Sequence, residues 1–418
     1  MKYLVLGGGI SGLVTSHLLA RKFPQSQILL IEKDKRCGGW VDTRKSFSDS
    51  GALIDVGPHS ARVQANNSNF IFSYLNLLDL NREIRFINYY SKANARFIYA
   101  GGKMIPLKFF TFDNYNVFRR SPLSSLIRTI LSRPNYKPLA DTEDITVDEF
   151  FRTRLGDDIA DYFASAMIRG IFAGDSREIS LKGALPIMAK YDEGNSNFIL
   201  NYAKNSLSGN IRPAKASPEV FQLLEMDENS VKVPYKSLAW SLNYGMEQFV
   251  DRILQKINDL PNVQIVTNCE VKSLKVLDQI KVDNDETYNF EVCYHNTESD
   301  GYFSANAHSI FSSLPPFVMN TILSEEVEFS DNAKKFLSTP FASVASCGIE
   351  LTGPKKYLPK KGFGYLVPAK EDRDILGVIF DSVGFDHMDG FDEKTGHRTS
   401  RFTVMMKGDE GKPKLLHF

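Results

Sequence analysis

The residues with the clearest chemistry in this sequence lie within its first 32 positions. Gly7, Gly9 and Gly12 form a GxGxxG pattern, and Glu32 follows 20 residues after the last glycine. Glycines at this spacing allow a tight turn, a close backbone approach to a pyrophosphate and close contact between a helix and a strand. A carboxylate at this separation can accept a hydrogen bond from a ribose hydroxyl. The pattern predicts a dinucleotide site, and its first turn comprises Gly7, Gly8, Gly9, Ile10, Ser11 and Gly12.

Two further glycine-containing turns indicate which dinucleotide is bound. Residues 36–40 read RCGGW and residues 55–60 read DVGPHS. A nicotinamide enzyme needs one such turn for its diffusible cofactor, whereas three loops with exposed backbone suit a longer cofactor that stays in place. We therefore expect FAD. The further cofactor contacts that we predict are Lys33, Arg36, Gly39, Trp40, Gly57, Pro58, His59 and Ser60.

Strands and a helix must hold these turns in place. Residues 2–6 (KYLVL) form an apolar run that favours a strand, and Leu13, Leu18 and Leu19 recur at helical spacing after the glycines. A second apolar run, residues 28–31, ends at Glu32. This order of strand, turn, helix and strand aims the N–H groups of the helix N-terminus at the phosphates.

The stretches GGGISGL, IEKDKRCGGW and DVGPHSAR together resemble the amine-oxidase-type flavoproteins. The Trp after the paired glycines, and the stretch from TVDEFFRTRLGDD through RGIFAGDSREISLKGA, are similar to the protoporphyrinogen oxidase family in particular. The resemblance implies an α/β fold, in which an FAD-binding Rossmann-like domain carries an inserted α+β substrate domain and a mostly helical membrane-facing part. The implied segments are FAD-binding at 1–90, substrate and membrane-facing at 91–235, FAD-binding again at 236–320, and substrate-domain strands at 321–418.

The same resemblance implies an activity. It is the FAD-dependent oxidation of protoporphyrinogen IX to protoporphyrin IX in haem synthesis, with molecular oxygen as acceptor and hydrogen peroxide as product. The cofactor performs such redox chemistry while the protein binds and orients the substrate. Accordingly, we predict no metal site, since the seven histidines are scattered without ligand spacing.

The resemblance also places residues near the substrate and the adenine. A porphyrinogen carries two propionates, and Arg binds a carboxylate with two parallel hydrogen bonds. The substrate contacts carried over are Arg96, Phe97, Arg169, Phe363, Leu366 and Met405, and the adenine-side contact is Val271. A purely structural role remains open for several of these residues. Arg96 can be a solvated charge at a sheet edge, and the glycines around Arg169 can simply end a helix. Phe363 can be a core residue, and Val271 can be an ordinary sheet residue.

Other patterns predict regular structure along the chain. Thr146 and Glu149 form a capping box ahead of a helix that ends at Gly156. The further expectations are helices at 70–80, from about 158, and at 246–257, strands at 96–100, 263–266, 269–276 and 309–314, and a polar excursion at 192–234.

Composition limits the partners. The 418 residues include 50 basic and 50 acidic side chains, so the formal net charge is zero and no global field favours nucleic acid. The four cysteines are far apart and form no CxxC pair, which indicates reduced structural thiols.

One segment suggests a membrane. Residues 103–137 hold seven basic residues and one acid among many aromatic and aliphatic ones, which suits anionic lipid headgroups, although an amphipathic helix covering its own core is the alternative. No run approaches about 20 uninterrupted apolar residues, so we predict peripheral contact. The resemblance implies that the protein is located at the mitochondrial inner membrane. We expect no cleaved presequence, because the first strand begins at residue 2. A homodimer is the oligomeric state that we consider.

The sequence also departs from the family. His59 stands where many relatives have Arg, so any charge assistance there depends on pH. Relatives continue into a C-terminal flavin segment that this sequence does not contain, which suggests a truncated chain. Two rival interpretations therefore stay open: another amine-oxidase-type oxidase or desaturase, and an inactive truncated product that binds a nucleotide.

Overall fold

The computed structural model describes residues 1–63, 68–106, 144–192, 218–227, 232–281, 287–323, 330–353, 358–359 and 361–408. Contacts divide the chain into two compact units. Unit 1 comprises Met1–Lys45, Leu53–Phe86 and Lys215–Phe341, and unit 2 comprises Ser46–Ala52, Ile87–Ala214 and Ala342–Phe418. The short segment Ser46–Ala52 thus belongs with unit 2, although both of its flanking segments belong to unit 1.

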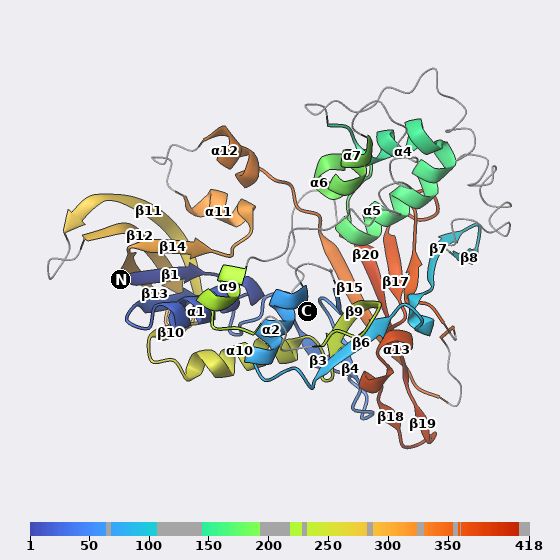
Figure 1. The fold of residues 1–418 in the computed structure, drawn as a ribbon, viewed down its shortest axis with the longest axis horizontal. Coiled ribbons are helices and arrows are strands. Elements are labelled where there is room, and N and C mark those ends of the chain that lie inside the picture. The colour runs from blue at the N-terminus through green and yellow to red at the C-terminus, as the bar shows by residue number, and fades with distance from the viewer. Residues whose placement is uncertain are drawn as a thin grey trace. The chain divides into compact units, whose positions relative to one another are not determined.

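Unit 1 is built on a four-stranded parallel sheet in the order β10-β2-β1-β14 (Figure 1). The strands are β1 (Lys2–Leu6), β2 (Gln27–Ile31), β10 (Val263–Val266) and β14 (Ser309–Ser312). Helix α1 (Ile10–Lys22) connects β1 to β2. The predicted crossover, and the strands predicted at 263–266 and 309–314, are confirmed.

Two layers cover this sheet because its apolar strands present side chains to both faces. One face packs against α1 and α10 (Glu247–Asn258), through alternate residues such as Val5 and Leu30. The other face packs against an antiparallel sheet, through Leu4, Leu6 and Ile31. That sheet has the order β11-β12-β13, with β11 (Cys269–Lys281), β12 (Thr287–Asn296) and β13 (Gly301–Ala307).

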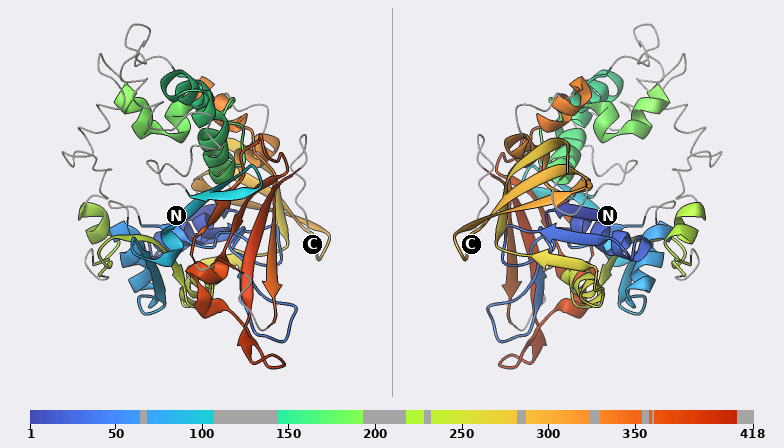
Figure 2. Two further views of the ribbon diagram at one scale, coloured as in Figure 1. Left: turned by 90° about the vertical axis from the view of Figure 1, so that its right-hand side faces the viewer. Right: turned by 90° about the vertical axis from the view of Figure 1, so that its left-hand side faces the viewer.

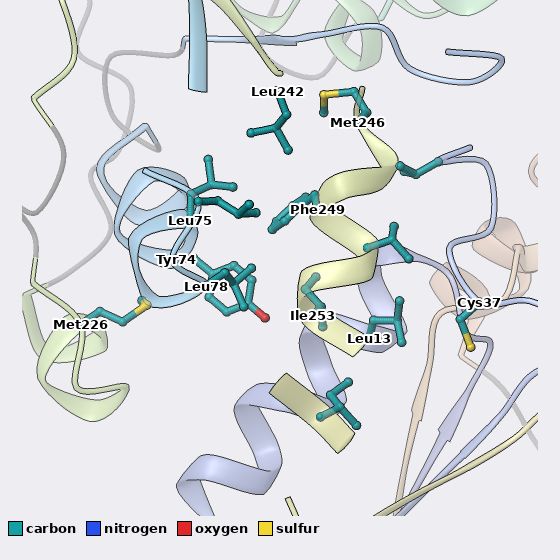
Figure 3. Packing of buried hydrophobic residues seen from close by; sticks show 14 of the residues in the cluster. Leu13, Cys37, Tyr74, Leu75, Leu78, Met226, Leu242, Met246, Phe249 and Ile253 are labelled. Atoms are coloured by element: carbon teal, nitrogen blue, oxygen red, sulfur yellow. The ribbon is translucent and has the colours of Figure 1, made fainter. Parts of the chain in front are cut away.

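The helical side of unit 1 also includes α2 (Ser68–Leu77). Figure 3 shows Tyr74 of α2 directed toward Phe249 and Ile253 of α10. Helix α2 ends before the predicted residue 80, because Asp79 adopts a left-handed conformation (φ 59°) and the Leu80 N–H bonds back to the Leu75 carbonyl. This capping motif ends the helix early.

Shorter elements complete unit 1. Strands β3 (Thr43–Lys45) and β4 (Leu53–Asp55) pair with each other, and β9 (Ser237–Leu242) lies between β5 (Ala61–Arg62) and β6 (Ile84–Asn88). The other helices in the described part of unit 1 are α9 (Pro218–Leu223), α11 (Pro316–Ile322) and α12 (Asp331–Leu337).

Unit 2 contains a six-stranded mixed sheet in the order β15-β20-β17-β16-β7-β8. Only the β16–β7 pair is parallel among these neighbours. The strands are β7 (Arg96–Ala100), β8 (Lys103–Pro106), β15 (Val344–Leu351), β16 (Gly364–Leu366), β17 (Ile375–Ile379) and β20 (Ser400–Lys407). The strand predicted at 96–100, with its turn at the following glycine pair, is confirmed.

Helices gather at one end of this sheet (Figure 1, Figure 2). They are α4 (Val147–Leu155), the π-helix η4 (Ile159–Ala164), α5 (Ser165–Phe172), α6 (Leu181–Ala184) and α7 (Pro186–Asp192). The Thr146 hydroxyl accepts from the Glu149 N–H at 3.1 Å, and Gly156 caps α4, as the capping box predicted. Smaller elements are η1 (Lys92–Asn94), α13 (Asp381–Gly384), η5 (Asp386–Met388), β18 (Phe391–Asp392) and β19 (His397–Arg398).

Two predicted features lie mainly outside the described residues. They are the basic, apolar segment 103–137, of which only Lys103–Pro106 is described, and most of the polar excursion 192–234. Among the residues that the structure describes, no helix combines the length and apolar character needed to cross a bilayer.

Candidate functional site

The first glycine turn joins β1 to α1 and leaves the helix N-terminus open. Gly7 has a φ of +95°, and a Cβ on Gly12 would lie 1.9 Å from the Gly7 carbonyl oxygen, so neither position accepts another residue without strain. Gly9 is the N-cap of α1, and within the described chain no side chain caps this helix or places an acid in its first turn. The first N–H groups of α1 are therefore suited to an anionic ligand such as a pyrophosphate.

The second turn packs directly on the first. The Gly38 N–H donates to the Gly8 carbonyl at 2.8 Å, and a Cβ on Gly39 would come within 3.1 Å of the Gly9 Cα. Arg36 donates to the carbonyls of Gly39 (2.8 Å) and Val41 (3.2 Å). Arg36 thus organises its own turn.

The third turn adjoins the second. A Cβ on Gly57 would lie 1.7 Å from the Trp40 carbonyl oxygen, and the Val56 N–H donates to the Asp42 carbonyl at 3.0 Å. His59 is buried, whereas the Trp40 side chain is 74% exposed. All three glycine turns thus lie in contact within unit 1, as binding of one extended ligand requires.

Glu32 lies at the end of β2, beside the first turn. Its side chain is buried, with Oε2 accepting from the Gly8 N–H at 2.5 Å and Oε1 accepting from the Asp34 N–H at 2.9 Å. An ionised carboxylate has about four acceptor positions, so about two remain for hydroxyl donors. Lys33 is exposed and pairs with Asp34 at 3.1 Å.

Cys37 lies beneath the same turn. Burial, with a further contribution from the Glu32 charge, raises the pKa of the Cys37 thiol to about 11. The thiol is therefore protonated at neutral pH and is not a reactive thiolate.

Ser313 is a site residue that sequence reasoning missed. It follows β14, and its hydroxyl oxygen lies 3.0 Å from the Leu6 carbonyl oxygen and 2.9 Å from the Gly7 carbonyl oxygen, so its single hydrogen can be donated to either or shared between them. A Cβ on Gly7 would lie 2.7 Å from this hydroxyl, so Ser313 fills the space that the glycine leaves. The available signal was a polar residue near the end of the strand predicted at 309–314.

Val271 lies in β11 and is buried against the sheet, opposite Tyr294 of β12. The backbone contact to adenine predicted for it stays a prediction.

Three of the predicted substrate residues share one face of the sheet in unit 2. Leu366 of β16 is in register with Gly377 of β17, which is in register with Met405 of β20. On the other side Leu366 is in register with Ile98 of β7, and Arg96 lies two residues earlier on that strand. Because side chains alternate along a strand, Arg96, Leu366 and Met405 lie on one face.

The two predicted phenylalanines are placed differently. Phe97 follows Arg96 directly and is in register with Tyr365, so it lies on the opposite face from Arg96. Phe363 precedes β16, and its backbone bonds to the Ala95 carbonyl (2.8 Å) and to the Phe380 N–H (2.9 Å). Both rings are half-buried, and the structure does not join Phe97 to the face that carries Leu366.

Arg169 is placed differently from the prediction. Its side chain is buried, and its terminal nitrogens donate to four backbone carbonyls, those of Val367 (3.1 Å), Asp372 (2.5 Å), Arg373 (2.6 Å) and Ile375 (3.3 Å). These bonds use the four hydrogens on the two terminal nitrogens. Direct propionate binding by Arg169 is therefore not supported by this geometry, unlike the case of Arg96, which is exposed.

Comparison with known proteins identifies the family. Residues 10–413 match the family described as flavin containing amine oxidoreductase. The protoporphyrinogen oxidase of Homo sapiens is 27% identical over 414 residues, covering 97% of this chain and 77% of that protein. That of Schizosaccharomyces pombe is 26% identical over 423 residues, covering 98% and 78%.

A solved structure agrees with the fold. A protein from Exiguobacterium assigned as a protoporphyrinogen oxidase superposes with a TM-score of 0.66 at 15% identity, covering 97% of this chain and 77% of that one. The family match spans almost the whole sequence, from the start of α1 onward, and includes the second and third glycine turns. This chain belongs to the flavin containing amine oxidoreductases, and FAD is its cofactor.

Proposed function

We propose that this protein oxidises protoporphyrinogen IX to protoporphyrin IX with FAD, in haem synthesis. The observation that carries this proposal is the match to proteins named protoporphyrinogen oxidase, which covers 97% of this chain and 77% of the human protein. A second support is the shared sheet face of unit 2, which places an exposed cation beside apolar side chains.

The residues of this chain bind and orient, and FAD, when bound, supplies the two-electron oxidant. The open N-terminus of α1 would hold the pyrophosphate of FAD, and Glu32 would accept hydrogen bonds from its ribose. The adjoining turns add backbone contacts, and Val271 adds one on the adenine side. Molecular oxygen serves as the final acceptor and yields hydrogen peroxide.

The substrate combines an apolar macrocycle with two anionic propionates. On the shared face of the unit 2 sheet, Leu366 and Met405 contact the macrocycle. Phe363, which directly precedes β16, is a further proposed contact. Arg96 lies at the start of β7 on this face, where its exposed guanidinium can form a bidentate pair with a propionate.

We further propose peripheral contact with the mitochondrial inner membrane through residues 103–137. The excess of seven basic residues over one acid in this segment supports attraction to anionic lipid. We also propose that the chain is divided into the four segments 1–90, 91–235, 236–320 and 321–418, and that it forms a homodimer.

The decisive experiment is purification followed by visible spectroscopy and an activity assay. We expect bound flavin, and an increase in porphyrin fluorescence when the reduced precursor is added. Arg96→Ala should raise KM for the substrate by about 10- to 150-fold, because one charge-assisted hydrogen bond contributes about 1.5 to 3 kcal/mol. Lys103→Ala is the control, since it removes a nearby exposed cation on β8. Oxidation of a polyamine, without porphyrin formation, would refute the proposal.

A further inference from the structure

We infer that Arg169 is a positioning residue for substrate binding. It holds the turn between β16 and β17 and thereby fixes Leu366 on the face that contacts the macrocycle. This inference rests on the proposed function, because it assigns Leu366 to the substrate.

The first support is the set of bonds made by Arg169. The acceptors span the whole turn, from Val367 directly after β16 to Ile375 at the start of β17. A guanidinium is planar and carries donors in a fixed fork, so four carbonyls bound to it are fixed relative to one another. Because Arg169 is only 6% exposed, water competes poorly for these bonds.

The second support is the slot that holds Leu366. A Cβ on Gly170 would lie 2.4 Å from Leu366 Cδ2, and a Cβ on Gly377 would lie 3.3 Å from the same atom. The residue next to Arg169 thus makes direct contact with the Leu366 side chain, and Gly377 is its neighbour in the sheet. A shift of α5 against this turn would therefore move Leu366.

Two further contacts join the turn to the same helical layer. The Ser165 hydroxyl accepts from the Ala369 N–H at 3.1 Å. Lys370 pairs with Asp161 at 3.6 Å and lies over the Tyr162 ring at 5.1 Å. All three helical partners precede Arg169 in η4 and α5, so one continuous helical segment holds the turn at several points.

A positioning role for Arg169 and direct recognition of a propionate by Arg169 predict different effects on KM. If Arg169 bound a propionate, its loss would affect the diacid substrate and spare the uncharged dimethyl ester. A positioning role predicts the same loss for both compounds, because Leu366 contacts the macrocycle that they share. Overall destabilisation of unit 2 would lower Tm without changing KM of the folded enzyme.

The test uses Arg169→Lys in the FAD-loaded enzyme, assayed with protoporphyrinogen IX and with its dimethyl ester. Lys keeps the positive charge but cannot bridge four carbonyls. We expect KM to rise by about three- to tenfold for both substrates, as expected for the loss of a net hydrogen bond. A rise confined to the diacid, or an unchanged KM, would overturn the inference.

One control variant and one additional test variant complete the comparison. Arg154→Lys alters a buried arginine of the same unit that binds Asp192 at 2.6 Å, away from the turn. It should lower Tm and leave KM unchanged. Ser165→Ala removes one bond to the turn and should raise KM for both substrates in the same direction, which keeps the test usable if Arg169→Lys folds poorly.

A second measurement does not depend on activity. Amide hydrogen exchange across residues 367–375 should be faster in Arg169→Lys than in the wild type and in Arg154→Lys. Unchanged exchange in this stretch would overturn the inference even if the enzyme is active. A wild-type enzyme that does not oxidise the porphyrinogen would refute the proposed function instead, and the exchange result would still decide whether Arg169 holds the turn.

Discussion

Replacing Glu32 by Gln tests how the nucleotide site works. The carboxylate accepts one backbone N–H on each oxygen, from Gly8 and from Asp34. A carboxamide has a single acceptor oxygen, so one of these N–H groups must face an NH₂ group. The substitution keeps the size of the side chain while removing its charge and half of its acceptor positions.

The structure sets the magnitude of the loss. Glu32 is buried, so the bond lost to a backbone N–H is charge-assisted and poorly replaced by water. We expect the free energy of unfolding of the apoprotein to fall by about 1 to 3 kcal/mol. Loss of one ribose hydroxyl bond to the carboxylate should weaken FAD binding by about 10- to 150-fold, equivalent to about 1.5 to 3 kcal/mol.

The assay is titration of apoprotein with FAD, followed by flavin fluorescence, with unfolding measured in parallel. Asp34→Asn is the matched control, because it removes the same charge two residues away and leaves the acceptor of the Gly8 N–H in place. We expect the control to bind FAD with nearly wild-type affinity. Equal affinities for wild type and Glu32→Gln would refute the role of the carboxylate.

Two further predictions concern unit 1. Gly12→Ala should abolish FAD retention, because its Cβ would lie 1.9 Å from the Gly7 carbonyl oxygen. The control Gly183→Ala, in a less crowded helix, should retain FAD. Retention of FAD by both variants would contradict the prediction. Burial lowers the pKa of His17 from 6.5 to about 4, with smaller contributions from the charges of Arg21 and Lys256. Between pH 6.5 and pH 4, therefore, the unfolded chain binds a proton at this residue that the folded chain does not bind. Stability should therefore fall as pH decreases from about 6.5 toward 4, by up to about 3 kcal/mol, in denaturant unfolding; a His17→Gln variant with the same pH dependence would rule out this cause.

The nucleotide crossover could be predicted because its signals are local. Residues 2–6 and 28–31 are short apolar runs, and the glycines between them impose the turn by their own conformational freedom. The capping box at Thr146 is equally local, since the hydroxyl and its N–H partner lie three residues apart. In each case, both residues of the predicted interaction lie within the sequence pattern itself.

Other features depend on partners far away in the sequence. The loop Ser46–Ala52 belongs to unit 2 because its serine hydroxyls at 48 and 50 bond to Glu350, at 2.6 Å and 2.5 Å. Nothing in the loop itself specifies that acceptor. Strand β11 was predicted as a strand, but its place in a separate antiparallel sheet is set by pairing with β12 and β13.

The two candidate propionate ligands show the limit most clearly. In the sequence Arg96 and Arg169 are equivalent, since each is a cation beside aromatic or glycine residues. The structure separates them, because the acceptors of Arg169 are carbonyls about 200 residues further along the chain. A propionate could form a bidentate pair with Arg169 only by displacing carbonyls from these buried or part-buried bonds, at a cost of about 1 to 3 kcal/mol for each carbonyl left unsatisfied. Arg96 lies at the start of β7 and is exposed to solvent, so a carboxylate can reach it without entering the turn that Arg169 holds. Charge recognition should therefore rest on Arg96, while Arg169 determines the shape of the surface beside it.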